Sequence, residues 1–135
     1  MGTEGKSSET SLQELRKAVQ TLKEALLFTE ELKDNLTQYK VARDGAIQRF
    51  EYCIEQAWKV AMRELGSRTK FAKPAVREMA RADLIDSAEA WLDFIEARNK
   101  TSHSYDEDVA REVFLQIQKF MPEVETLLSR LEKQS

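Results

Sequence analysis

The sequence contains few of the residues that mark several common protein classes. Its 135 residues include one cysteine, one histidine, two prolines and four glycines. One cysteine cannot form an internal disulfide, and one histidine with one cysteine cannot supply the usual ligands of a zinc site within one chain. So few glycines and prolines argue against a β-sandwich or barrel with many turns. No glycine-rich phosphate loop is present, and we predict neither a cofactor nor a metal.

Long apolar runs and a strong net charge are also absent. No stretch approaches the roughly 18 apolar residues of a membrane span, and the first residues lack the apolar core of a secretion signal. We therefore expect a cytoplasmic protein with no membrane association. The net charge is −3, so any contact with nucleic acid has to come from a local basic patch.

Strong helix formers dominate what is present, and apolar side chains recur every three or four positions along most of the chain. With 41% hydrophobic residues the chain can bury one core. Four long amphipathic segments and one short segment predict an all-α, up-and-down helical bundle. We expect one domain over residues 11–135, preceded by a disordered tail over residues 1–10.

Capping residues and breaks in the apolar pattern predict the helix ends. The second long helix is expected to run from an N-cap at Asp44 to a C-terminal glycine at Gly66. Pro74 fits the first turn of the short helix. Asp86 is expected to cap the fourth helix, and Pro122 predicts a kink or restart within the fifth.

The segment Arg98–Tyr105 separates the last two long helices and holds the only histidine, His103. Arg98 follows Trp91 and Ile95 on one apolar stripe, so a permanent charge occupies a core-facing position. A guanidinium cannot lose its proton to escape burial. Arg98 therefore needs an acceptor there, such as a carboxylate, a carbonyl or a phosphate.

A new helix is expected directly after His103, because Ser104 and Glu107 form a capping box, with Asp106 as a competing N-cap. The turn can bring His103 round towards Arg98. An arginine fork holds a phosphate and a histidine moves a proton near neutral pH, so together they suffice to cleave RNA through its own 2′-hydroxyl without a metal. A two-fold dimer would place two copies of each residue in one cleft.

Structural interpretations of the same residues stay open. A histidine beside a helix terminus can bond the last carbonyls, and Tyr105 can pack on the next helix as a hydrophobic staple. The acidic run Asp106–Asp108 complements the dipole of a helix more readily than it binds magnesium. Cys53 is expected to be a buried, unreactive thiol.

Basic residues cluster around the short helix. Five of them lie within fourteen positions: Arg68, Lys70, Lys73, Arg77 and Arg81. A solvated face is the simpler interpretation of such a run, and contact with RNA or with an acidic partner is the other.

Two segments resemble a known family. They are DGAIQRFEYCIEQAWK at Asp44–Lys59 and RNKTSHSYDEDVA at Arg98–Ala110. Both are similar to the HEPN superfamily, in the branch paired with minimal nucleotidyltransferases. The order Arg98, four residues, His103, one residue, Tyr105 resembles the signature of that branch.

The resemblance implies a homodimeric bundle with a companion nucleotidyltransferase, and it allows two functions. The first is a metal-independent endoribonuclease toxin that acts on RNA and is neutralised when the companion attaches AMP to a tyrosine. The second is a non-catalytic substrate-binding subunit of a two-component nucleotidyltransferase. Residue by residue, the resemblance assigns catalysis to Arg98 and His103, support to Asn99 and Thr101, and modification to Tyr105. We take the toxin as the leading hypothesis.

Overall fold

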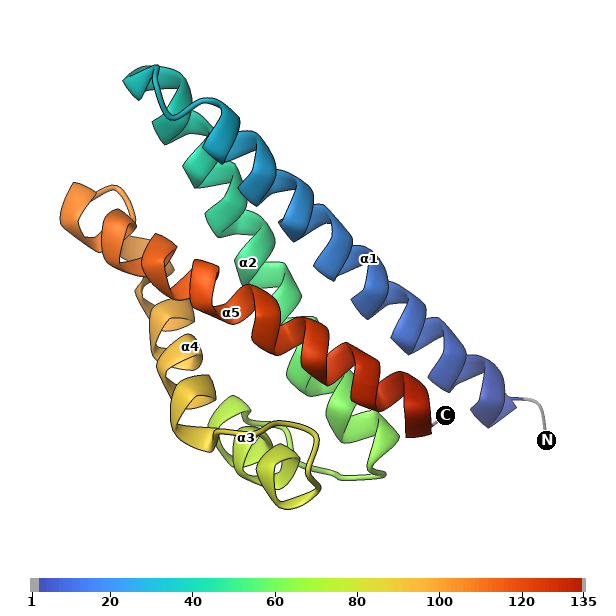
Figure 1. The fold of residues 1–135 in the computed structure, drawn as a ribbon. Coiled ribbons are helices and arrows are strands. Elements are labelled where there is room, and N and C mark those ends of the chain that lie inside the picture. Colours follow the sequence, from blue (N-terminus) through green and yellow to red (C-terminus); the bar gives the residue numbers. More distant parts are fainter. Residues whose placement is uncertain (1–2, 135) are drawn as a thin grey trace.

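The computed structural model describes residues 3–134, with side chains from Thr10 onward, and these residues form five α-helices and one 3-10 helix. The elements are α1 (Thr3–Glu31), α2 (Leu36–Glu64), α3 (Ala72–Arg81), α4 (Ala88–Lys100), η1 (Thr101–His103) and α5 (Glu107–Gln134). The long helices α1, α2 and α5 pack on one another, and α3 and α4 pack against α2 and α5 at one flank (Figure 1). The predicted all-α bundle is confirmed.

An aromatic cluster at the centre of the core fixes α4 against α2 and α5. The ring of Phe120 lies edge-on to Phe50 at 5.1 Å, to Trp91 at 5.4 Å and to Phe94 at 5.3 Å between centroids. All four side chains are buried. Edge-to-face pairs contribute about 0.5–1.5 kcal/mol each beyond the area they bury, so this cluster holds the end of α4 in a defined place.

The second helix begins earlier than predicted. α2 starts at Leu36, where the Asn35 side chain accepts a hydrogen bond from the backbone N–H of Gln38 at 3.0 Å, so the predicted N-cap at Asp44 is wrong. The polar residues of Asp34–Lys40 break the apolar stripe, and the stripe does not resume at Arg43, a core-facing residue of α2 that is only 4% exposed. A buried arginine interrupts the apolar pattern without interrupting the helix.

Gly66 ends α2 as predicted. It adopts a positive φ of 65°, and the N–H of Ser67 donates to the carbonyl of Met62 at 2.9 Å. This is the Schellman arrangement, in which a glycine adopts the left-handed conformation at no steric cost. Pro74 lies in the first turn of α3 as expected, where its missing N–H costs nothing.

Two boundaries near the C-terminal helices differ from the predictions. Ser87, not Asp86, caps α4 by accepting a hydrogen bond from the backbone N–H of Ala90 at 3.0 Å. Asp86 forms an ion pair with Arg130 of α5 at 2.8 Å instead. α5 continues through Pro122, so of the predicted kink or restart the restart does not occur, and the kink stays a prediction.

α1 is helical from Thr3, so its backbone begins within the tail predicted over residues 1–10. Residues 1–2 and 135 lie outside the described residues, as do the side chains before Thr10. The division of the chain into a tail and one domain stays a prediction.

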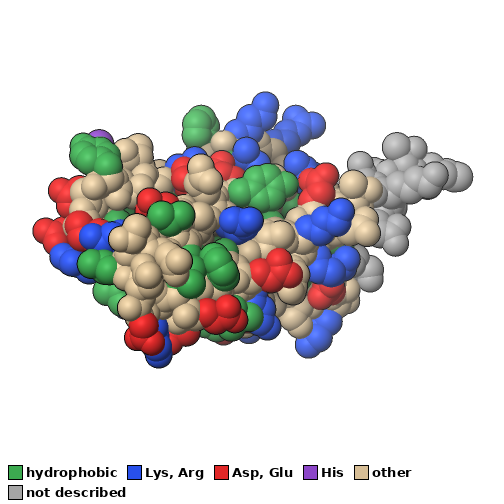
Figure 2. Space-filling view, turned by 90° about the horizontal axis from the view of Figure 1, so that it is seen from above, with side chains coloured by type: hydrophobic (Ala, Val, Ile, Leu, Met, Phe, Trp, Pro, Cys, Tyr) green, Lys and Arg blue, Asp and Glu red, His purple; other side chains and the backbone are tan. Residues whose placement is uncertain are grey.

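The surface carries charges of both signs. On the face shown in Figure 2, acidic and basic side chains are interspersed with hydrophobic ones. Within residues 3–134 no helix has a segment that is both long enough and apolar enough to cross a membrane.

Candidate active site

The last turn of α4 and the turn that follows it carry the candidate catalytic residues, Arg98 and His103. Thr101 is buried, and its hydroxyl donates to the carbonyl of Arg98 at 2.8 Å. The N–H of Ser104 donates to the carbonyl of Thr101 at 3.1 Å, which closes the short helix η1. Thr101 therefore fixes the backbone between Arg98 and His103.

Arg98 lies at the edge of the core, with a side chain that is 33% exposed. Its Nη1 lies 3.5 Å from Oε2 of Glu51 on α2. Its Nε is buried and has no hydrogen-bond partner among the described residues. The acceptor that the sequence predicted is thus a carboxylate, but one long contact uses only one nitrogen of the guanidinium.

His103 and Tyr105 are both exposed on the turn, and their rings lie edge to face with centroids 6.2 Å apart. Tyr105 is 86% exposed, so it does not pack on α5 as a staple. No hydrogen bond from the His103 ring occurs among the described residues, which leaves the ring free for other partners. His103 lies close to Arg98 in sequence but makes no described contact with it, and Asn99 lies exposed beside Arg98.

The start of α5 is fixed by two carboxylates with separate tasks. Asp106 caps the helix, because its Oδ1 accepts from the backbone N–H groups of Asp108 at 2.9 Å and of the next residue at 3.3 Å. The predicted capping box of Ser104 and Glu107 does not form, because Glu107 reaches across to Arg43 on α2. Two hydrogen bonds of 2.8 Å join each guanidinium Nη to one carboxylate oxygen.

Glu107 sits among three cations. Hydrogen bonding by Arg43 lowers its pKa to about 2, helped by the charges of Arg43, Lys40 and Arg111 and opposed by partial desolvation. The Lys40 and Arg111 nitrogens lie 3.8 Å and 3.7 Å from the carboxylate. The pair therefore anchors the chain two residues after Tyr105.

Arg43 is a residue that our sequence analysis missed. It stands four positions before Ile47 on the apolar stripe of α2, which is the same signal that drew attention to Arg98 on α4. Its structural role is to fix the beginning of α5 and, through it, the turn that carries His103.

The basic cluster around α3 does not act as one unit. Lys73 forms an ion pair with Glu96 of α4 at 2.8 Å, and this contact lowers the pKa of Glu96. The remaining four are exposed: Arg68, Lys70, Arg77 and Arg81.

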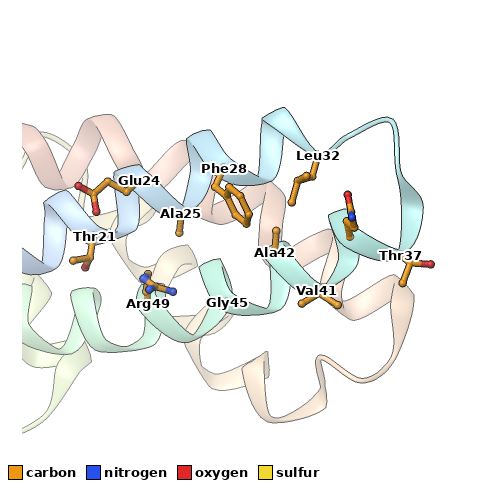
Figure 3. Close-up of a pocket in the computed structure, with 11 residues that line it drawn as sticks. Thr21, Glu24, Ala25, Phe28, Leu32, Thr37, Val41, Ala42, Gly45 and Arg49 are labelled. Atoms are coloured by element: carbon orange, nitrogen blue, oxygen red, sulfur yellow. The ribbon is translucent and has the colours of Figure 1, made fainter.

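A groove of about 660 Å³ lies between α1 and α2 near the hairpin that joins them (Figure 3). Phe28 of α1 and Val41 of α2 line it and remain 55% and 68% exposed. Glu24 and Arg49 also line it, further along the two helices from the hairpin. The sequence pattern gave no sign of this groove, because the apolar part of its lining fits a core-facing stripe equally well.

Cys53 is fully buried, and burial raises the pKa of its thiol to about 12. The prediction of a buried thiol is confirmed, and a raised pKa disfavours the reactive thiolate. The acidic run at the start of α5 is engaged by backbone N–H groups and arginines, and no group of three or more metal-ligating side chains occurs among the described residues.

Comparison with known proteins places this fold in a family. Residues 10–133 match the family described as "Nucleotidyltransferase substrate binding protein like". The chain belongs to this family. The resemblance noted in the sequence is therefore confirmed.

Proteins similar to this chain are described in two ways, as a ribonuclease and as a substrate-binding domain. A Haemophilus influenzae protein named "Probable ribonuclease HepT" is 33% identical over 99 residues, which are 67% of this chain and 68% of the relative. The structure of HI0074 from Haemophilus influenzae, described as the fold of a substrate-binding domain of a nucleotidyltransferase, matches with a TM-score of 0.78 at 28% identity over 90% of this chain and 98% of that one. A Thermus thermophilus structure matches with a TM-score of 0.72 at 29% identity over 87% and 98%.

Proposed function

We propose that this protein is a metal-independent endoribonuclease that acts in the cytoplasm as the toxin of a pair, with a minimal nucleotidyltransferase as its antitoxin. The observation that carries the proposal is the state of Arg98. Its guanidinium stands at the end of α4 with one long contact to Glu51 and a buried Nε that has no described partner. An exposed histidine follows on a turn that is held at both ends.

In the proposed reaction, His103 acts as the general base or acid. The ring takes the proton of the RNA 2′-hydroxyl, whose oxygen attacks the adjacent phosphorus, or it protonates the 5′-oxygen that leaves. Arg98 donates hydrogen bonds to the phosphorane oxygens as negative charge grows on them. The products are a 2′,3′-cyclic phosphate and a free 5′-hydroxyl. Glu51 is a positioning residue that holds one end of the Arg98 guanidinium.

A homodimer completes the proposed site, because base and acid are best supplied from opposite sides of the phosphorus. An isologous interface that includes the turn after α4 would bring Arg98 and His103 of both protomers to one cleft.

Tyr105 is the proposed site of control by the nucleotidyltransferase. Its exposure makes the phenol oxygen accessible, and attack of that oxygen on the α-phosphorus of ATP would release pyrophosphate and leave AMP on the ring. The added negative charge would stand beside His103, where the RNA phosphate has to lie.

A second candidate function is that of a non-catalytic substrate-binding subunit for the nucleotidyltransferase. Two observations favour it. The structurally similar HI0074 is described in those terms, and the groove between α1 and α2 is large enough for a small substrate.

The decisive experiment is cleavage of a 5′-labelled RNA pool by the purified protein in excess chelator. We expect fragments that end in 2′,3′-cyclic phosphates, and a loss of at least about 100-fold in His103→Ala. Ser102→Ala is the matched control, because Ser102 is an exposed neighbour on the same turn with no assigned role. If the folded, unmodified wild-type protein leaves the RNA intact, the ribonuclease proposal fails and the substrate-binding subunit takes its place.

A further inference from the structure

A basic hollow lies where α2 ends and the loop to α3 begins. It has a volume of about 270 Å³, and its lining includes two cations of α2 and two of the loop. The full lining is Trp58, Lys59, Met62, Arg63, Ser67, Arg68, Thr69 and Lys70. Four of the eight lining residues are cations and none is acidic, in a protein whose net charge is −3. We call this site the basic hollow.

The loop beside the hollow is held in one shape. Glu78 of α3 accepts hydrogen bonds from the hydroxyls of Ser67, at 2.7 Å, and of Thr69. The N–H of Thr69 also donates to the Ser67 hydroxyl at 3.1 Å. These bonds lower the pKa of Glu78. Ser67 and Thr69 are therefore tied to α3, and the alternate residues Arg68 and Lys70 are left exposed.

The cations of the hollow are weakly neutralised. Lys59 has one carboxylate, Glu55, at 3.5 Å, and Arg63 donates to the neutral hydroxyl of Ser11 at 2.7 Å. Arg68 and Lys70 have no hydrogen-bond or ion-pair partner among residues 10–134, whose side chains are described. Four positive groups around one hollow repel one another, and an anion bound there relieves that repulsion.

The hollow lies further along α2 than the proposed active site. Trp58 and Met62 of its lining follow Glu51, the partner of Arg98, by seven and eleven positions, which puts them within about 20° of the same face of α2. Lys59 and Arg63 stand in the same relation to Tyr52, which is 53% exposed and lies about 100° round the helix from Glu51. At a rise of about 1.5 Å per residue, the two cations lie roughly 12 and 18 Å along α2 from Glu51.

We propose that the basic hollow binds phosphate groups of a single-stranded RNA whose scissile phosphate lies at Arg98, with the exposed ring of Tyr52 available to stack on a base between them. The inference rests on the proposed function and names where the substrate runs. Single-stranded nucleic acid is typically bound in this way, by cations that follow the backbone and aromatic rings that stack on bases.

The test measures binding of a fluorescently labelled single-stranded RNA by anisotropy, at salt concentrations from 50 to 200 mM. His103→Ala serves as the parent because it leaves the RNA intact during the measurement. The test protein adds Arg68→Gln and Lys70→Gln to this parent. The control adds Lys17→Gln and Lys119→Gln, which are exposed on α1 and α5 and change the net charge by the same amount.

Each lost phosphate contact lowers the slope of log affinity against log salt by about 0.7 for a single strand. We therefore expect the slope of the test protein to fall by about 1.4. Between 50 and 200 mM salt, the affinity of the parent should then decrease about sevenfold more than the affinity of the test protein. The control should keep the slope of the parent. Circular dichroism should show the same helix content in all three proteins.

Three results would overturn the inference. They are an unchanged slope in the test protein, an equal fall in test and control, and the absence of RNA binding by the parent. The first would direct attention to an acidic protein partner for the hollow. Because binding is measured without cleavage, these results are separate from the chelator assay, which alone decides whether the protein is a ribonuclease.

Discussion

Two arginines in this protein hold equivalent places in their helices and have different surroundings. Arg43 lies one turn before the buried Ile47 of α2, and Arg98 lies one turn after the buried Ile95 of α4. Each puts a permanent charge on an apolar stripe. The sequence pattern treats them alike, so only the structure can tell what each one does.

Their carboxylate partners make the difference. Arg43 is 4% exposed and shares two hydrogen bonds of 2.8 Å with Glu107. Arg98 is 33% exposed and approaches Glu51 through one contact of 3.5 Å. The Nε of each arginine is buried without a hydrogen-bond partner among the described residues. Both Nη groups of Arg43 are engaged by one carboxylate, whereas Arg98 has one long contact through Nη1 and keeps most of its donors for a phosphate. This difference supports a structural role for Arg43 and the proposed catalytic role for Arg98.

The strongest test of this comparison is the same substitution at both sites. Arg98→Lys is expected to lower kcat/KM for RNA cleavage by about 100-fold or more, because an ammonium cannot supply the forked donor to the phosphorane. Arg43→Lys should keep most of the activity. Both values come from initial rates on one labelled RNA in chelator. Equal losses at the two positions would erase the distinction between them.

The free energy of unfolding should depend more on Arg43 than on Arg98, which is the opposite order from that of activity. Arg43→Met removes two charge-assisted hydrogen bonds and is expected to lower the free energy of unfolding by about 2 kcal/mol. Arg98→Met should change it by about 0.5 kcal/mol or less, as is usual for a partly exposed side chain with one weak contact. Urea titration followed by circular dichroism measures both. A larger loss for Arg98→Met would make Arg98 a structural residue.

The sequence predicted the bundle because apolar residues recur every three or four positions along each helix. The prediction of helix ends failed where a polar residue holds a core-facing position. The polar run Asp34–Lys40 was interpreted as a break between helices, and the charge of Arg43 hid the core-facing position that follows it, so the start of α2 was placed too late. The partner of Arg43, Glu107, is 64 positions away. No local pattern can show such a pair.

The candidate site was predictable in its residues and less so in its surroundings. The turn around His103 could be predicted, because the apolar stripe of one helix ends before it and the stripe of the next helix begins after it. The choice between Ser87 and Asp86 as a cap depends on the ion pair of Asp86 with Arg130. The basic hollow joins Lys59 and Arg63 to the loop beyond them, and it forms only because Gly66 turns the chain back. These features depend on tertiary contacts that spacing does not encode.

A smaller effect is expected from the partner of Arg98. Glu51→Ala should lower kcat by about 10-fold with a smaller change in KM, because the guanidinium stays present but loses the contact that orients it. Glu51→Gln, which can still accept a hydrogen bond, should recover part of kcat. Steady-state kinetics on the same RNA separates the two parameters. Faster cleavage by Glu51→Ala would mean instead that the carboxylate competes with the phosphate.

The smallest effect concerns the pH dependence of stability and tests the ion pair of Arg43 with Glu107. The folded protein lowers the pKa of Glu107 from 4.5 to about 2, so its ionised form stabilises the fold. That contribution is complete above about pH 4.5 and is lost as the pH falls towards 2. Glu107→Gln does not titrate, so its urea midpoint should fall less between pH 5 and pH 2.5 than that of the wild type.

An equal fall of the urea midpoint in Glu107→Gln and in the wild type would contradict this expectation. The ion pair of Arg43 with Glu107 would then add little to the stability of the fold, and the structural role of Arg43 would be lost.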